Sequence, residues 1–523
     1  MKITRIKIHN FRSIKDQEIF IGDHNIFVGE NNSGKSNLID AIRYFYDEIK
    51  GLDVEDFFNH EDGDLFVEIE FKLTDASKKF FEEKNPKYIL KNDNIIVQKF
   101  AKNISGKIEE FGRHGFLLKE NTFDKDNKFF GFSGVSKSLL ADIIYIPPIK
   151  KIEDELKTTN QSTTMMKIIK KIIGSKIDGD PDFVQLNESL EKINKKSFFA
   201  DVEKDLSKRM SGYNCSVEFL FETMDSSDVV SKTQLKLKEG DGTNAMNVSN
   251  KGLGTQRALL VNLLQYWAQK EIEEKSKGAD NISPTIILIE EPEIFQHPQK
   301  QKMLFSELKE LSNELSTQVF MNTHSSHFLI QKDSDLLSIF RTYKEKKETI
   351  FNQLKEDGAT FSLLKLDNDF DFFKWLNGER NQLFFAVNIV LCEGNTEKLL
   401  AEYLIREKYK NDYASRSFFT IIDCGGKYKL PHWINLCEEL GINFILIYDL
   451  DGNKSEKHIK INNEIKTLTD VSKKLIKCYI SENDIEVSLF GAKVSKDEKH
   501  LIIEKIDKGL ANVKVLEEIR AIF

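Results

Sequence analysis

Short, mostly apolar runs recur along the 523-residue chain, and several of them end at glycine or at acidic residues. Four of these runs lie at residues 25–28, 286–289, 387–391 and 444–447. A short apolar run bounded by turn-forming or charged residues is typical of a parallel strand that is buried on both faces. Apolar residues at three- and four-residue spacing follow several runs and predict helices. The alternation predicts an α/β fold with parallel sheets.

The run at 25–28 leads into a glycine-rich segment, GENNSGKS, which precedes a predicted helix. Strand, glycine loop and helix in this order are typical of a phosphate-binding loop, in which backbone N–H groups cradle the phosphates. Lys35 would reach the β and γ phosphates of ATP, and the Ser36 hydroxyl would ligate Mg²⁺. The predicted nucleotide-binding residues of this loop are Gly29, Asn32, Ser33, Gly34, Lys35, Ser36 and Asn37.

Two acids, Glu290 and Glu291, follow the run at 286–289. Glu290 would support the magnesium ion through water, and Glu291 would polarise the attacking water as the catalytic base. The general pattern prefers Asp at the first position, so Glu290 departs from it, and a charged cap after a strand is the alternative for the pair. Another apolar strand ends at His324, which would sense the γ-phosphate unless its role is structural.

A third segment, NVSNKGLGTQRALL, places Ser249, Gly252 and Gly254 before an amphipathic segment that extends to Trp267. Together with the opening sequence ITRIKIHNFRSIKD, it resembles the signature loop of ABC-type ATPase heads, in the branch that includes RecF and the SMC-like proteins. The resemblance implies that this loop of one subunit covers the ATP bound by another. It therefore implies a homodimer or a higher homo-oligomer.

Residues 150–243 interrupt the ATPase motifs and contain little strand-like sequence. Pro181 predicts the start of a helix there. The segment is too short, and too broken by SKIDGDPD, for the long coiled-coil arms of chromosome-scale SMC proteins. A compact helical insert that pairs two subunits is expected instead. The predicted division of the chain is an ATPase domain at 1–149 and 244–345, the helical insert at 150–243, a linker at 346–384 and a C-terminal domain at 385–523.

In the C-terminal domain, acids directly follow two of the apolar runs. Glu393 follows the run at 387–391, and Asp449 and Asp451 follow the run at 444–447. Side chains two residues apart in a strand point to the same face, so both aspartates would aim at one spot if the strand persists that far. The carboxyl ends of parallel strands meet at one sheet edge, which predicts an acid cluster that attracts a cation. A solvated turn that closes a strand is the alternative for the aspartates.

Glu-Gly followed by Asp-x-Asp resembles a Toprim domain, the metal-binding fold of topoisomerases, bacterial primases and certain nucleases. An ABC-type head followed by a Toprim domain resembles the overcoming lysogenization defect (OLD) family, which includes the nuclease subunit of the Gabija antiphage system. The segments THSSHFL, LNGERNQLFFAVNIVLCEGNTEK and ENDIEVSLFG extend this resemblance over nearly the whole chain. It implies an ATP-dependent endonuclease that nicks or cuts DNA with Mg²⁺ or Mn²⁺, in antiphage defence.

The resemblance also implies the residues of the nuclease site. Glu393, Asp449 and Asp451 are expected to be catalytic, and a lysine near the scissile phosphate is expected among Lys493, Lys496 and Lys499. Glu482 competes with Glu486 for the role of the last acid, and Glu397 has the alternative role of a helix-start carboxylate. The implied metal ligands are Glu393, Glu397, Asp449, Asp451 and Glu486.

Two other functions compete with this prediction. The first is an ATP-driven DNA-binding or repair protein of the RecF and SMC-like class without nuclease activity. The second is a primase-like polymerase, which is weaker because no nucleotide-binding or zinc module accompanies the Toprim segment. Hydrolysis by water is expected rather than strand passage, since no room remains for a domain with a nucleophilic tyrosine. A helicase or another defence protein would be a further partner.

Composition changes this picture little. The net charge of −8 does not predict DNA binding, although a large acidic protein can hold a local basic groove. No apolar run approaches the roughly 18 residues of a membrane helix, and the charged start is unlike a signal peptide, so we expect a cytoplasmic protein without a membrane partner. The five cysteines are scattered and lack CxxC spacing, which argues against a structural zinc site.

Overall fold

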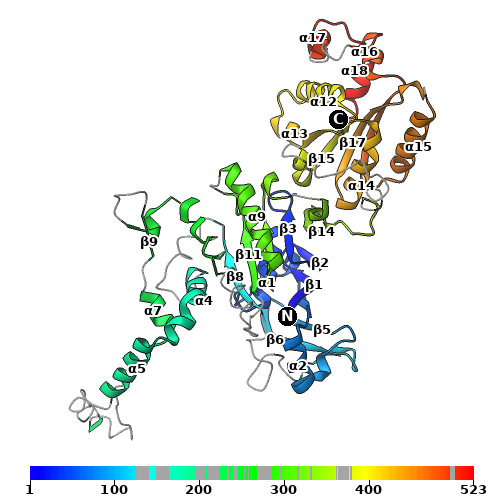
Figure 1. Ribbon diagram of the computed structural model, residues 1–523. Coiled ribbons are helices and arrows are strands. Elements are labelled where there is room, and N and C mark those ends of the chain that lie inside the picture. The colour runs from blue at the N-terminus through cyan, green and yellow to red at the C-terminus, as the bar shows by residue number, and fades with distance from the viewer. Residues whose placement is uncertain are drawn as a thin grey trace. The chain divides into compact units, whose positions relative to one another are not determined.

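The chain divides into two compact units, Met1–Leu139 with Phe320–Phe523, and Leu140–Val319 (Figure 1). The computed structural model describes residues 1–124, 126, 129, 141–148, 164–194, 204, 207–208, 224–232, 235–238, 245–252, 254–256, 258–260, 262–264, 266–267, 285–294, 297–314, 317–329, 333–360, 362, 376, 380–453, 455–494 and 501–523. Of the three candidate lysines, Lys496 and Lys499 lie outside the described residues.

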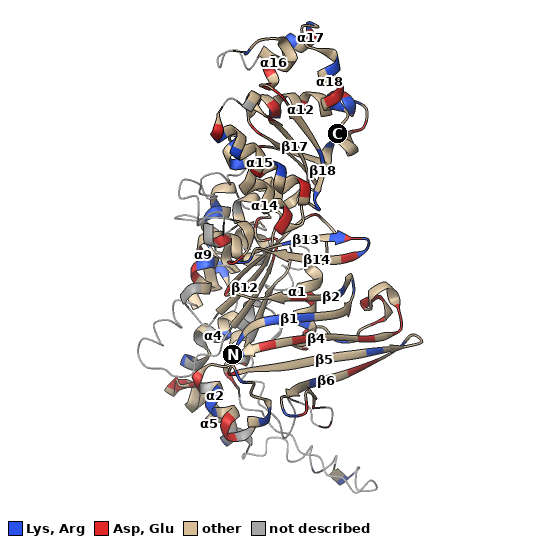
Figure 2. Cartoon of the chain, turned by 90° about the vertical axis from the view of Figure 1, so that its right-hand side faces the viewer, with Lys and Arg blue, Asp and Glu red and all other residues tan. Residues whose placement is uncertain are grey.

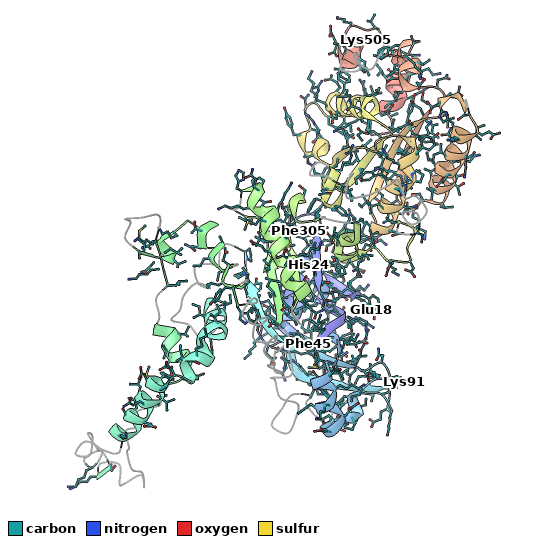
Figure 3. All side chains as sticks on the ribbon, in the orientation of Figure 1. Glu18, His24, Phe45, Lys91, Phe305 and Lys505 are labelled. Atoms are coloured by element: carbon teal, nitrogen blue, oxygen red, sulfur yellow. The ribbon has the colours of Figure 1, made fainter. Side chains whose placement is uncertain are left out.

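The first unit begins with an antiparallel sheet in the order β2-β1-β4-β5-β6-β7 (Figure 2). One face packs on α1 (Lys35–Phe45), which ends at Phe45, labelled in Figure 3. The Phe45 ring lies 6.0 Å from the Phe71 ring of β4. On the other face, Arg5 pairs with Glu68 and Glu70 at 3.1 and 2.8 Å. The period of two in the sequence therefore gives the sheet one apolar and one charged face. The strands are β1 (Lys2–Phe11), β2 (Ile14–Phe20), β4 (Gly63–Lys72), β5 (Asn94–Ile104), β6 (Lys107–Leu117) and β7 (Thr122–Phe123), and α2 (Asp75–Lys84) follows β4.

The strand before the glycine loop, β3 (His24–Val28), is buried along its whole length. It pairs in parallel with β13 (Ile339–Glu345) and neighbours β12 (Thr317–Asn322). The hairpin partner of β13 is β14 (Glu348–Gln353). Burial on both faces explains why this strand reads as a short apolar run rather than as an alternating pattern.

In the second unit, β11 (Thr285–Glu290) pairs in parallel with β8 (Asp142–Ile146) and neighbours β12. The described part of the insert is mainly helical, and α5 begins at Pro181 as predicted. The described residues between 254 and 267 are helical, with Leu260, Leu264 and Trp267 fully buried. The remaining elements of this unit are α4 (Thr164–Asp178), α5 (Pro181–Asn194), α7 (Ser226–Lys232), β9 (Lys236–Leu237), β10 (Met246–Asn247) and α9 (Pro298–Glu314).

The C-terminal part of the first unit is a fully parallel four-stranded sheet in the order β16-β15-β17-β18. Its strands are β15 (Asn388–Cys392), β16 (Phe419–Asp423), β17 (Asn443–Asp449) and β18 (Leu475–Ser481). Its helices are α12 (Asn395–Lys408), α13 (Tyr413–Ser417), α14 (Leu430–Leu440), α15 (Glu456–Val471), α16 (Ile485–Phe490), α17 (Ile502–Asp507) and α18 (Val513–Arg520). Val390 and Ile445 pack with Leu400, Ile485 and Ile519 in one apolar cluster on one face of the sheet.

The predicted α/β fold with parallel strands is confirmed by this sheet and by the pairs of β3 with β13 and of β8 with β11. Among the helices of the described residues, none has the length and apolar character needed to cross a membrane.

Candidate nucleotide and metal sites

The loop between β3 and α1 has a backbone that only glycine accommodates at two positions. Gly29 and Gly34 have φ angles of 139° and 103°. A Cβ atom at Gly29 would lie 1.9 Å from the Thr342 carbonyl oxygen, and one at Gly34 would lie 2.1 Å from Thr349 Oγ1. Asn32, between them, is also left-handed, with φ 63°. The glycines therefore allow the tight turn that presents backbone N–H groups at the start of α1.

Lys35 is folded back over this loop. Its buried side chain donates hydrogen bonds from Nζ to the carbonyl oxygens of Gly29 and Glu30, at 3.0 and 2.7 Å. Asn37 donates to Ser13 Oγ at 2.6 Å, which fixes the start of α1 against the N-terminal hairpin. An ammonium group held at the head of a glycine loop fits the phosphates of a nucleotide.

His324 lies near Lys35. Partial burial of the imidazole and, as the smaller cause, the Lys35 ammonium together lower the pKa of His324 to about 4. The residue as a whole is exposed. The backbone before it is fixed, since Thr323 N donates to the Phe27 carbonyl oxygen at 3.2 Å. A neutral imidazole beside the glycine loop is compatible with the predicted phosphate-sensing role.

The other predicted ATP-site residues belong to the second unit. Glu290 ends β11, is buried, and accepts a hydrogen bond from the Tyr145 hydroxyl at 2.6 Å. Glu291 lies beyond the strand with a left-handed φ of 48°. Gly252 has open space around its Cα, and the Ser249 side chain lies outside the described residues. The assembly of Glu290, Glu291, Ser249, Gly252 and Gly254 with Lys35 into one ATP site remains a prediction.

Two acids meet at the carboxyl edge of the C-terminal sheet. Glu393 follows β15, and its Oε2 atom accepts a hydrogen bond from the Asp449 backbone N–H at 3.1 Å. Asp449 ends β17, and its Oδ2 atom accepts from the Ile485 N–H at 2.9 Å. Within the described residues, the buried Asp449 Oδ1 atom has no hydrogen-bond partner. A buried carboxylate oxygen without a partner is costly and points to a ligand.

Asp451 lies near the same acids, but its backbone is not the continuing strand that would aim both aspartates at one spot. The strand does not persist that far, because β17 ends at Asp449. Asp451 instead begins a short 3-10 turn with a left-handed φ of 54°, and Gly452 follows at 59°. Non-glycine residues seldom adopt this conformation, and such strain concentrates at functional sites.

Glu397 and Glu486 are both buried. Glu397 Oε2 accepts a hydrogen bond from Gly394 N–H at 2.9 Å, so its alternative role as a helix-start carboxylate is present in the structure. Glu486 Oε1 accepts from Thr396 Oγ1 at 2.8 Å. The competing acid, Glu482, is exposed. The geometry therefore favours Glu486 as the last acid of the cluster.

Burial and crowding raise the pKa values of the central acids. Burial, as the largest cause, and the charges of Glu397, Glu393 and Asp451 together raise the pKa of Asp449 to about 9. Burial also raises the pKa of Glu393 to about 7, against the opposing effect of Lys427. Among the described residues, no three acidic, histidine or cysteine side chains are already arranged as a metal cage. The unpartnered Asp449 oxygen and the all-carboxylate donor set nevertheless fit a hard divalent cation.

Two lysines approach these acids. Lys427, in the turn that follows β16, contacts Asp451 and Glu393, and the sequence did not single it out. Its sequence signal is the Gly-Gly-Lys that follows an apolar strand. Lys493 pairs with Asp484 at 2.7 Å, and its pKa is raised first by that hydrogen bond and further by Asp451 and Glu486. Of the lysines expected near the scissile phosphate, Lys493 is the one within the described residues.

Comparisons with known proteins match both parts of the chain. A family model described as AAA ATPase domain matches residues 1–329. A second, described as overcoming lysogenization defect protein-like, TOPRIM domain, matches residues 384–451. The second match contains Glu393, Asp449 and Asp451 and ends before Glu486.

Curated relatives match across most of the chain. The Old nuclease of Escherichia phage P2 is 25% identical over 480 residues, which are 86% of this chain and 77% of the relative. Endonuclease GajA of Bacillus cereus (strain VD045) is 25% identical over 482 residues, which are 86% of this chain and 75% of the relative. A matching solved structure, the SMC head domain from Thermotoga maritima, has 15% identity to this chain and a TM-score of 0.33, with coverage of 68% of this chain and 100% of that chain. The chain belongs to the AAA ATPase domain family and carries the Toprim domain of the overcoming lysogenization defect proteins, as its motifs implied.

Proposed function

We propose that this protein is an ATP-binding and ATP-hydrolysing, metal-dependent DNA endonuclease. The observation that carries the proposal is the convergence of buried acids at the carboxyl edge of the C-terminal sheet, with Asp449 Oδ1 left without a partner among the described residues. The relatives named as nucleases extend over 86% of the chain. Metal ions held by such carboxylate clusters serve phosphoryl-transfer reactions in nucleases, phosphatases and polymerases, and phosphodiester hydrolysis is one of these reactions.

The acids would bind the metal ions, and a lysine would position the DNA phosphate. Divalent ions, Mg²⁺ or Mn²⁺, would supply an activated water and would stabilise the leaving oxygen. Asp449 offers its unpartnered Oδ1, and Glu393 and Asp451 offer the oxygens that contact Lys427. Lys493 would contact the scissile phosphate. The residues proposed to hold the ions are Glu393, Glu397, Asp449, Asp451 and Glu486.

The ATPase part would work through the glycine loop. Lys35 would turn from the loop carbonyl oxygens toward the β and γ phosphates, and Ser36 and Glu290 would hold the magnesium ion. Glu291 would orient the attacking water, and His324 would contact the γ-phosphate.

A second copy of the chain would complete each ATP site with its Ser249, Gly252 and Gly254. The helical insert at 150–243 would support pairing of the two copies. We propose a homodimer or higher homo-oligomer in the cytoplasm, which acts in antiphage defence with DNA as substrate and with a helicase or another defence protein as a further partner.

A supercoiled-plasmid assay with Mg²⁺ or Mn²⁺ tests the function against its alternatives. Nicked or linear plasmid supports the endonuclease. A shifted but intact plasmid would instead identify the ATP-driven DNA-binding or repair protein, and primer synthesis would identify the polymerase. ATP hydrolysis measured in the same reactions reports the state of the ATPase part.

A further inference from the structure

Lys427 is a buried lysine that lies among the acids of the C-terminal sheet. Its side chain is 3% exposed, its Nζ atom bonds to Asp451 Oδ2, and the same Nζ lies 4.0 Å from Glu393 Oε2. A buried ammonium group is tolerated where opposite charges surround it. Lys427 and the two acids therefore form one cluster in which the ammonium group offsets part of the carboxylate charge, at oxygens that the proposed function assigns to metal binding.

The backbone holds Lys427 in this position. The lysine follows Gly425 and Gly426, whose φ angles of 77° and 113° disfavour any residue with a Cβ atom. Gly426 N–H donates to the Glu393 carbonyl oxygen at 2.7 Å, and Gly425 N–H donates to Asp423 Oδ1 at 2.8 Å. The turn is thus fastened to the strand end that carries Glu393, so the approach of Lys427 is fixed by the fold.

Another basic side chain faces the same acid less closely. His458 Nδ1 lies 4.0 Å from Asp451 Oδ2, and its side chain is 29% exposed. Water screens a charge at that position more than it screens the buried Lys427 ammonium. Lys427 is therefore the stronger of these two countercharges for Asp451.

We propose that Lys427 is a resident cation of the metal site: its ammonium group occupies the space between Asp451 and Glu393 and leaves it when a divalent ion binds these carboxylates. This inference rests on the proposed function, since it takes both acids as metal ligands. Two cations this close repel each other strongly in a buried site. Without metal, the lysine keeps the acids from repelling one another, and a metal ion has to displace it.

Calorimetric titration of the full-length protein with MnCl₂ tests this exchange in the absence of DNA and nucleotide. Lys427→Met keeps the length of the side chain and removes the competing charge, so we expect Mn²⁺ affinity to rise by about tenfold or more. The control is Lys429→Met, which makes the same charge change in the same turn, where Lys429 Nζ donates to the Gly425 carbonyl oxygen. Its Mn²⁺ affinity should equal that of the wild type.

A second measurement uses the wild-type chain and does not depend on the folding of a variant. Reductive methylation followed by peptide mass spectrometry should modify Lys427 faster with saturating Mn²⁺ than with EDTA, whereas Lys429 should react equally in both. Unchanged Lys427 reactivity, or a folded Lys427→Met variant that binds Mn²⁺ no more tightly, would overturn the inference. A wild-type protein that binds no Mn²⁺ and cuts no plasmid would instead refute the proposed function.

Discussion

Asp449 is a carboxyl group that stays protonated in the folded protein to a pH far above the ordinary pKa of an aspartate. Burial first, and neighbouring acids second, raise its pKa to about 9, and burial raises that of Glu393 to about 7. A folded state that binds extra protons is most stable at low pH. Without metal, these two groups therefore cost stability progressively as the pH rises from about 4 through 7 and 9.

Replacing Asp449 with Asn should remove most of that cost. The amide oxygen can still accept the Ile485 N–H, and no charge is buried. At pH 8 in EDTA we expect Asp449→Asn to be more stable than the wild type by at least about 2 kcal/mol, and the difference should shrink at pH 5. Thermal unfolding at the two pH values measures it. Equal melting temperatures of the two proteins at pH 8 would argue that the buried Asp449 carboxyl group does not destabilise the fold.

Lys35 supports a second residue-scale prediction. Lys35→Ala removes the ammonium group above the glycine loop, so ATP hydrolysis should fall to background. Glu291→Gln should bind ATP but hydrolyse it at least about 100-fold more slowly, because the water loses its base. Lys15→Ala, which removes a lysine paired with Glu348 on the surface, is the matched control. Undiminished turnover in folded Lys35→Ala would rule out the assignment of the loop.

The acids could be predicted individually from the sequence, but their arrangement could not. Glu393 and Asp449 directly follow buried strands, which the apolar runs indicate. Asp451 depends on a left-handed turn, and neighbouring residues in the sequence do not specify such a turn when the residue is not glycine. Lys427 acts through a contact across 24 positions of the chain, for which the sequence has no periodic signal.

At the scale of elements, the buried guanidinium of Arg341 joins β13 to the C-terminal sheet. It donates to the carbonyl oxygens of Leu440 and Gly441, at 3.3 and 3.0 Å, and to that of Ala386 at 2.9 Å. Leu440 and Gly441 precede β17, and Ala386 precedes β15. Arg341 thus ties the strand beside β3 to the starts of both strands that lead to the acids.

Arg341→Met should leave three buried carbonyl oxygens without this donor and should destabilise the protein by about 2–4 kcal/mol. Arg341→Lys should restore part of the loss, since an ammonium reaches fewer of these oxygens than the planar guanidinium. Chemical denaturation measures the effect, with the exposed Arg416→Met as the control. If the midpoint denaturant concentration of Arg341→Met equalled that of the wild type, the hydrogen bonds of Arg341 would contribute no stability.

The sequence predicts those strands and helices that a single local pattern marks. The strands β3, β11, β15 and β17 coincide with apolar runs, and α5 begins at the proline that predicts it. The antiparallel N-terminal sheet was not predicted. Its long strands mix charged and apolar positions, and their pairing joins residues as far apart as Lys2 and Lys72, which local patterns do not encode.

At the scale of the whole molecule, the signature loop predicts at least a dimer, because it has a role only opposite the nucleotide of another subunit. Light scattering should give a mass of at least two chains, and Glu291→Gln with ATP should favour this form because bound ATP persists. A monomeric mass with and without ATP, for both proteins, would contradict the predicted assembly.

The central claim is that the C-terminal carboxylates form a nuclease site separate from the ATPase site. Asp449→Ala with Asp451→Ala removes two acids from the cluster, so metal affinity and plasmid nicking should be lost. ATP hydrolysis should continue, since Lys35, Ser36 and Glu290 are untouched. Nicking of supercoiled plasmid in Mg²⁺ or Mn²⁺, measured beside ATP turnover, tests both statements at once. The account predicts no nicking with near wild-type ATP turnover, and nicking by the double variant at the wild-type rate would contradict it.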